Sequence, residues 1–134
     1  MTAADLQQLA TVRIAEATEL FRTGHFDGAY YLAGYGVECA LKACIAKGFK
    51  QGHIPKKEDV LKVYTHDLSS LLGQATINVK SIAGTAVEIS WGIVKDWRVE
   101  SRYELGTTQK EAEDFLLAVT DPKDGVLQWI QKYW

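Results

Sequence analysis

A carboxylate and an ammonium stand one helical turn apart inside an apolar stretch of the chain. Glu38 and Lys42 lie in the segment 29–46, where apolar or small residues occupy most other positions. A helix that is apolar on all sides is surrounded by protein, and a charge within it requires a partner or a cavity. A Glu-to-Lys pair at this spacing contributes only about 0.2–0.5 kcal/mol on a helix surface. We therefore expect further polar partners from elsewhere in the chain.

Two other clusters can supply those partners. His66 and Asp67 precede an apolar run, so Asp67 can cap a helix while the imidazole bonds outward; a simple capping turn is the alternative. Arg98 and Arg102 lie one turn apart and can together bind a phosphate or a carboxylate. The alternative for the arginines is structural, with Arg102 pairing with Glu38 or Arg98 with a nearby acid.

The sequence contains no pattern for a metal or a cofactor. None of the three histidines, His25, His53 and His66, has a ligating neighbour at the spacing of a metal site. No glycine-rich loop of the phosphate-binding kinds is present. Cys39 and Cys44 are five residues apart in one helical segment, which points them to different faces. We expect both to be small core residues, outside any disulfide or zinc site.

Composition indicates one domain over residues 1–134 with no strong positive field. The chain has 15 Lys and Arg against 17 Asp and Glu, a formal charge of −2, which argues against a general nucleic-acid binder. The net charge does not exclude a local basic patch. The first ten residues lack a signal pattern, and no apolar run approaches the roughly 18 residues of a membrane span. We expect a cytoplasmic protein without a membrane segment.

Apolar spacing predicts helices throughout, and so an all-α fold: an up-and-down bundle of four to five helices. Gly34 and Gly36 lie in mid-helix, where glycine is costly, so they indicate close helix approach or room for a ligand. Asp27 is the expected N-cap of the second helix. The segment 48–65 is expected to form a crossing loop with one helical turn at 58–63. Asp121-Pro122 should interrupt the last helix. The expected helices cover residues 5–22, 27–47, 68–75, 79–97 and 108–134, the first two as an antiparallel hairpin.

Three motifs follow one another in an order that resembles the bacterial HEPN domain family. They are the segment Tyr30–Ala43 (YYLAGYGVECALKA), the His-Asp-Leu of residues 66–68, and the Trp-x-x-x-x-Arg-Tyr-Glu of residues 97–104. The resemblance spans about residues 5–133. It implies a helical bundle that usually forms a homodimer and is often encoded with a minimal nucleotidyltransferase. It also implies relatives that are RNA-cleaving toxins.

The arginine and histidine pattern of those ribonucleases is absent here. HEPN ribonucleases resemble one another in an arginine followed, after four to six residues, by a histidine that meets its twin across the dimer. No arginine of this chain has a histidine at that distance, and no histidine follows Arg98. A metal-free ribonuclease needs a group that titrates near neutrality, for which histidine is the usual choice. An arginine and a histidine from different helices, Arg102 and His66, are the alternative catalytic pair.

Two functions follow from the resemblance and this departure. The first is a non-catalytic, dimer-forming module, in a toxin–antitoxin-like context, that binds a nucleotide or a nucleotidyltransferase partner. The alternative is a divergent, metal-independent ribonuclease that uses Arg102 with His66 on RNA. A third, structural option is docking through an exposed aromatic tail, made of Trp129, Tyr133 and Trp134. The expected ligand groove of the first function is lined by Tyr35, Glu38, Lys42, His66, Arg98, Arg102 and Tyr103.

Overall fold

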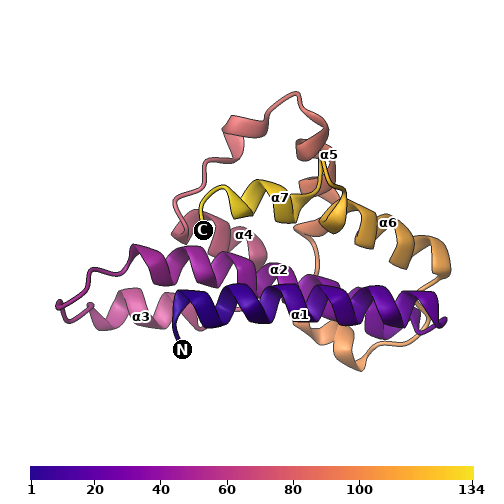
Figure 1. Ribbon diagram of the computed structural model, residues 1–134, viewed down its shortest axis with the longest axis horizontal. Coiled ribbons are helices and arrows are strands. Elements are labelled where there is room, and N and C mark those ends of the chain that lie inside the picture. Colours follow the sequence, from indigo (N-terminus) through magenta and orange to yellow (C-terminus); the bar gives the residue numbers. More distant parts are fainter.

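A computed structural model describes residues 1–134 and is entirely helical, which confirms the all-α prediction (Figure 1). Three of the helices have only six or seven residues, so the bundle contains more elements than the apolar spacing alone separates. The α-helices are α1 (Ala3–Arg22), α2 (Phe26–Gly48), α3 (Lys57–Val63), α4 (Leu68–Gln74), α5 (Ala86–Val94), α6 (Gln109–Thr120) and α7 (Val126–Gln131), and the 3-10 helices are η1 (Val79–Ile82) and η2 (Val99–Tyr103).

The long helices α1 and α2 form the predicted antiparallel hairpin. A capping box starts α1, in which the Thr2 hydroxyl accepts from the Asp5 amide and the Asp5 carboxylate accepts from the Thr2 amide. The prediction of Asp27 as N-cap of α2 is wrong, because the helix begins one residue earlier with His25 at the cap. The Asp27 carboxylate instead accepts the Thr107 amide at 2.8 Å, and this bond lowers the pKa of Asp27.

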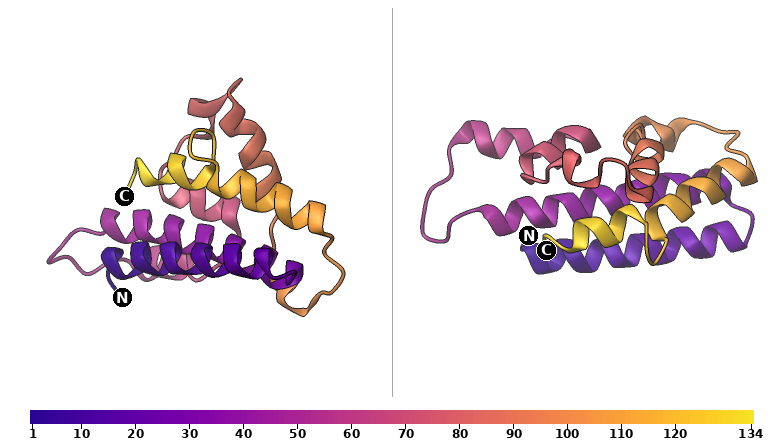
Figure 2. Two further views of the ribbon diagram at one scale, coloured as in Figure 1. Left: turned by 45° about the vertical axis from the view of Figure 1, so that its right-hand side comes forward. Right: turned by 90° about the horizontal axis from the view of Figure 1, so that it is seen from above.

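Helix α2 is the centre of the molecule. It contacts α1, α4, α6, α7 and η2, and more than half of its residues are buried. Figures 1 and 2 show α6 and α7 lying between the α1–α2 hairpin and α5. Both cysteines of α2 are buried in its core faces, as predicted. A segment surrounded in this way must be apolar on nearly every side, which is the pattern of its sequence.

Two glycines allow the neighbours of α2 to approach its backbone. A Cβ placed on Gly34 would lie 2.1 Å from the Trp97 indole nitrogen, and one on Gly36 would lie 2.6 Å from the Ile14 side chain. Trp97 is 2% exposed, so its ring cannot move aside into solvent. The predicted close approach of a helix is therefore confirmed at Gly36, where α1 packs, whereas at Gly34 the neighbour is the Trp97 ring, which lies between α5 and η2.

The predicted helix 79–97 is wrong as one continuous element. It divides into η1, a turn at residues 83–85, and α5, which ends at Val94. Gly84 adopts φ of 76°, a left-handed conformation that no helix residue takes and that glycine adopts without strain. Apolar spacing continues across this turn because Ile82 and Trp91 both face the core. The periodicity identified the buried residues but not the break.

The C-terminal region follows the predicted interruption. The Thr108 hydroxyl accepts from the Glu111 amide at the start of α6, the helix ends before Asp121-Pro122, and α7 resumes at Val126. The exposed aromatic tail is wrong for Trp129, which is 4% exposed and packs edge-on against Trp91. At the C-terminus, the Lys47 ammonium donates to the Trp134 carbonyl.

The C-terminus of α4 carries the one non-glycine residue with positive φ. Thr76 has φ of 57°, its amide bonds to the Gly73 carbonyl, and the Ile77 amide bonds to the Leu72 carbonyl. This is the left-handed helix cap in which glycine is the usual residue, and a β-branched side chain is strained there.

We expect Thr76→Gly to raise the free energy of unfolding by about 0.5–1 kcal/mol, because relief of the left-handed strain exceeds the added chain entropy. Urea denaturation followed by circular dichroism measures the change. Thr76→Ala is the matched control: it removes the hydroxyl but keeps the Cβ, so it should give no comparable gain. Equal stabilisation by both variants would contradict the backbone explanation.

Candidate functional site

The buried carboxylate of Glu38 has two nitrogen partners. Its Oε1 accepts from Lys42 Nζ at 2.8 Å, and its two oxygens lie 3.0 and 2.9 Å from His66 Nδ1. Glu38 is 2% exposed and is the only buried charged residue of the chain. The expectation of a further partner from elsewhere in the sequence is met by His66, 28 residues away. The alternative pairing of Glu38 with Arg102 is not formed, because these two partners occupy the carboxylate.

Two interactions fix the position of His66. The next residue, Asp67, accepts the Ser70 amide at 2.7 Å and caps α4, as predicted. The carboxylate of Glu38 lies against Nδ1, which places the proton on that nitrogen, because a carboxylate accepts and does not donate. The imidazole side chain is 50% exposed. Nε2 is therefore the nitrogen left for a ligand, and a carboxylate fixes its orientation.

Lys42 is the less exposed of the two nitrogen partners of Glu38. Its side chain is 19% exposed, and one of its three N–H donors is used by Glu38. The cluster thus has a buried anion on the inside, with the Lys42 ammonium and Nε2 of His66 left for a ligand. The ammonium donates to an anion directly, whereas Nε2 donates only when the ring is doubly protonated as an imidazolium. We call Glu38, Lys42 and His66 the charged cluster.

Tyrosines continue the line of the charged cluster along α2. Tyr31, Tyr35, Glu38 and Lys42 are spaced by four, three and four residues, so they share one helical face. The Tyr31 ring stacks on Tyr35 at 6.2 Å and on Trp97 at 6.0 Å between centroids. Burial, followed by the Cys39 and Glu38 charges, raises the pKa of Tyr35. Sequence reasoning missed Tyr31, although its position one turn before Tyr35 marks it.

The structure keeps Arg98 outside the charged cluster. It lies in extended backbone before η2, where its guanidinium pairs with Glu100 at 3.5 Å. Both side chains are more than half exposed, so the pair contributes little to stability. The predicted helical turn between Arg98 and Arg102 is wrong, because α5 ends at Val94 and η2 begins only at Val99.

Arg102 approaches the tyrosine face from η2. Its guanidinium carbon lies 4.8 Å from the centre of the Tyr103 ring, a cation–π distance. Tyr103 raises the pKa of Arg102, and Tyr31 does so to a smaller extent. Arg102 therefore lies beside Tyr31, at one end of this face of α2. His66 instead bonds to Glu38, in the charged cluster. No hydrogen bond or ion pair joins Arg102 to His66, so the alternative catalytic pair is not assembled within one chain.

The two cysteines are suited to packing, not to chemistry. Burial raises the pKa of Cys39 and of Cys44 to about 11 each, and for Cys39 the neighbouring charge of Glu38 adds to the effect. The thiolate is the reactive form, and it is scarce four units below the pKa. Neither thiol is therefore a nucleophile at neutral pH.

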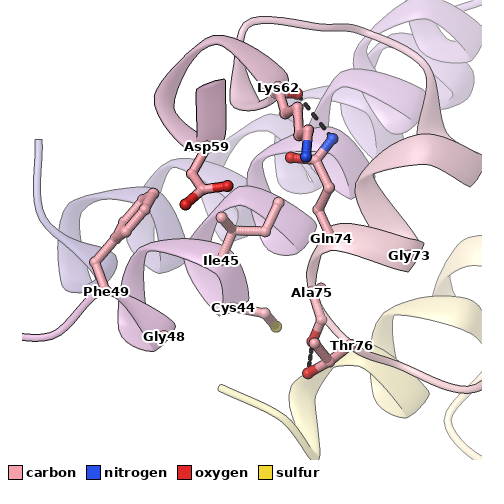
Figure 3. Close-up of a pocket in the computed structure, with 10 residues that line it drawn as sticks. All are labelled: Cys44, Ile45, Gly48, Phe49, Asp59, Lys62, Gly73, Gln74, Ala75 and Thr76. Atoms are coloured by element: carbon pink, nitrogen blue, oxygen red, sulfur yellow. Dashed lines mark hydrogen bonds between the residues drawn. The ribbon is translucent and has the colours of Figure 1, made fainter. Parts of the chain in front are cut away.

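A separate pocket of about 490 Å³ opens between the ends of α2, α3 and α4 (Figure 3). The Asp59 carboxylate and the side chains of Lys62 and Gln74 line it, together with Phe49, the residue that follows α2. Gln74 donates to the Lys62 carbonyl at 2.8 Å, so its amide nitrogen is already used. None of the seven residues predicted for the ligand groove contributes to this pocket.

The structure has neither a metal-ligand cluster nor a membrane-crossing helix. No three His, Cys, Asp or Glu side chains come together as ligands for a metal ion. No helix combines the length and the apolar character needed to cross a membrane.

Comparison with known proteins identifies the family. The family model of the HEPN domain matches residues 3–121, nearly the whole chain and all three motifs. No curated protein and no solved structure matches the chain. The match includes α1, α2 and the charged cluster, and it ends one residue after α6. On this evidence the chain belongs to the HEPN domain family.

Proposed function

We propose that residues 1–134 form a non-catalytic, dimer-forming HEPN module that binds the phosphate of a nucleotide at the charged cluster. The observation that carries this proposal is the buried carboxylate of Glu38, which holds the Lys42 ammonium and orients His66, whose Nε2 donates to an anion in the imidazolium form. Charge-assisted hydrogen bonds from such donors are the usual means of binding phosphate. The family resemblance adds a minimal nucleotidyltransferase as the proposed protein partner.

The geometry supports binding over RNA cleavage by this chain. Arg102, the arginine of the alternative catalytic pair, contacts Tyr103 and Tyr31 and does not bond to His66. One observation favours the ribonuclease alternative: the Glu38 carboxylate orients His66 as a carboxylate orients a general base. The cation beside His66 is Lys42, whose ammonium is already paired with Glu38, and the arginine that the family's ribonucleases combine with histidine is missing from the cluster.

Titration calorimetry with ATP tests the binding proposal. We expect wild-type protein to bind ATP below millimolar concentration and His66→Gln to bind about tenfold more weakly, the value of one charge-assisted hydrogen bond. Glutamine keeps a donor for Glu38, so the fold is retained. Lys110→Met removes an equally cationic, 85% exposed side chain on α6 and should leave the affinity unchanged. No heat of binding at millimolar ATP would overturn the ligand proposal.

The same preparations incubated with RNA in EDTA separate the two functions. The non-catalytic proposal expects intact RNA at high protein concentration. Cleavage that disappears in both His66→Ala and Arg102→Ala would establish the ribonuclease alternative and overturn the non-catalytic one.

The dimer proposal commits to the groove between α1 and α2. Val12, Ala15, Leu20 and Leu32 make its lining apolar, and the acids at its edge, Glu16 and Glu19, are each paired with an arginine of α1. A two-fold interface brings a surface patch against itself, so a neutral rim is required. The apolar groove between α5 and α6 lacks this property, because Asp121 and Asp124 line it without a cationic partner and would face their own copies.

We expect Val12→Asp to convert a dimer into a monomer, because it places an unpaired charge in the centre of the self-complementary groove. Light scattering coupled to size exclusion measures the mass. Ile89→Asp is the matched control: its side chain is 70% exposed on α5, outside the proposed interface, and the mass should not change. Loss of the dimer in Ile89→Asp alone would move the interface to α5–α6.

A further inference from the structure

An apolar pocket lies directly beside the charged cluster. It has a volume of about 350 Å³ and lies between the N-terminal end of α1, the C-terminal end of α2 and α3. Figure 1 shows these three elements side by side at one end of the molecule. Seven of its eight lining residues are hydrophobic: Met1, Leu6, Ala46, Phe49, Val60, Val63 and Tyr64, and the eighth is Lys42.

Lys42 is shared by the pocket and the charged cluster. Its side chain lines the apolar pocket, while its ammonium bonds to Glu38 at 2.8 Å. Tyr64, at the pocket, is two residues from His66, which bonds to the same carboxylate. A ligand in the pocket therefore has apolar walls and the Lys42 side chain beside it, and Lys42 shares its carboxylate partner with His66. This is the general form of a small-molecule site, in which few polar groups orient a mainly apolar contact.

Two aromatic rings remain available at this pocket. Phe49 is 42% exposed and Tyr64 is 81% exposed, although both are large side chains that are usually better covered. Helix α3 has no buried residue, so this wall of the pocket is not filled by the core. Exposed rings beside an unfilled apolar space are suited to stacking on a flat aromatic ligand.

Positive charge is concentrated in the segment that contributes Phe49 and Val60 to this pocket. The segment 47–62 contains five lysines against two acids, while the whole protein has a formal charge of −2. This is the local basic patch that the composition left open. A phosphate-bearing ligand is attracted here and not to the rest of the surface. A neutral apolar ligand would gain nothing from this charge.

We propose that the apolar pocket is a base-binding subsite: a nucleotide places its base among Phe49, Val60 and Tyr64 and its phosphates at Lys42 and His66. The proposal rests on the proposed phosphate site and adds the base to it. A pocket of this volume is within the usual range for small ligands and can enclose a nucleobase. The lysines of segment 47–62 do not line this pocket, so they act on the phosphates through their long-range field.

Calorimetry with three probes tests the subsite on the full chain. We expect ATP to bind about tenfold or more tightly than inorganic tripolyphosphate, because only ATP carries a base to stack. Octyl phosphate, which has an alkyl chain in place of the base, enters the apolar pocket but cannot stack, so it should bind more weakly than ATP. If octyl phosphate bound as tightly as ATP, the proposed recognition of a base would be overturned, and the pocket would accept any apolar anion.

Two pocket variants and one control locate the base. Val60→Trp fills the pocket and Tyr64→Ala removes a ring, and each should reduce ATP affinity about tenfold while tripolyphosphate affinity stays unchanged. Leu61→Trp adds the same bulk on α3 at a residue outside the pocket lining and should leave both affinities unchanged. Tyr64 is so exposed that its removal spares the fold, which keeps the test decisive if Val60→Trp is unstable.

The outcomes distinguish this subsite from the phosphate site itself. If ATP binds, His66→Gln weakens it, and both pocket variants bind as wild type does, the subsite is overturned and the phosphate site stands. If neither ATP nor tripolyphosphate binds wild-type protein, both proposals fail.

Discussion

Gly34→Ala is expected to lower the free energy of unfolding by about 3 kcal/mol. The added methyl group would lie 2.1 to 2.3 Å from three atoms of the Trp97 indole, inside any allowed contact distance. Trp97 is 2% exposed and stacks on Tyr31, so the ring can move only by displacing the core or the tyrosine face. Urea denaturation of the variant, followed by tryptophan fluorescence, measures the loss.

The matched control for this prediction is another helical glycine. Gly92 lies within α5 with no atom near its missing Cβ, and Gly92→Ala should raise stability by about 0.5–1 kcal/mol through helix propensity. The two substitutions are chemically identical and have opposite expected signs. A Gly34→Ala protein as stable as wild type would contradict the packing of Trp97 on α2.

The second large effect is expected for Lys42→Met, which should cost about 3 kcal/mol of stability. Methionine retains the apolar stem, so the change removes mainly the ammonium at 2.8 Å from Glu38. The carboxylate is then buried, 2% exposed, with His66 as its single remaining partner. An uncompensated buried charge is costly because the protein interior solvates it poorly.

A double-mutant cycle attributes this loss to the pair. Adding Glu38→Gln to Lys42→Met removes the stranded charge, so the double variant should be more stable than the sum of the single losses predicts. Lys110→Met is the surface counterpart, because Lys110 and Asp114 form an exposed pair, and its cost should stay below about 0.5 kcal/mol. Additive single losses would show that Glu38 and Lys42 do not depend on each other.

Local signals in the sequence were sufficient where one short segment decides the structure. The Asp67 cap of α4 and the break at Asp121-Pro122 depend on residues within three positions of each other, and both predictions are confirmed. The break between η1 and α5 depends on Gly84, one residue in a segment whose apolar spacing is otherwise continuous. Core burial maintains that spacing across a turn, so periodicity could not reveal it.

Partner choice was beyond the reach of local signals. Asp27 has the residue type of an N-cap, but its carboxylate bonds to the Thr107 amide, 80 residues away. For Glu38 the sequence offered His66 and Arg102 as possible partners, and the fold selects His66. Arg102 instead lies against Tyr103, on a 3-10 helix that no apolar pattern predicted. Contacts between distant segments depend on how the helices pack, which spacing along one helix does not specify.

The sequence by itself determined the helical class, the HEPN resemblance and the need for a polar partner inside α2, because apolar periodicity and motif order are local properties of the chain. Only the tertiary structure decided which groups meet at Glu38, that the Trp97 ring occupies the space above Gly34, and that an apolar pocket adjoins Lys42. The physical reason is the same in each case. Packing brings together side chains that are far apart in sequence, and the energy of a buried charge or a filled gap is defined only by that packing.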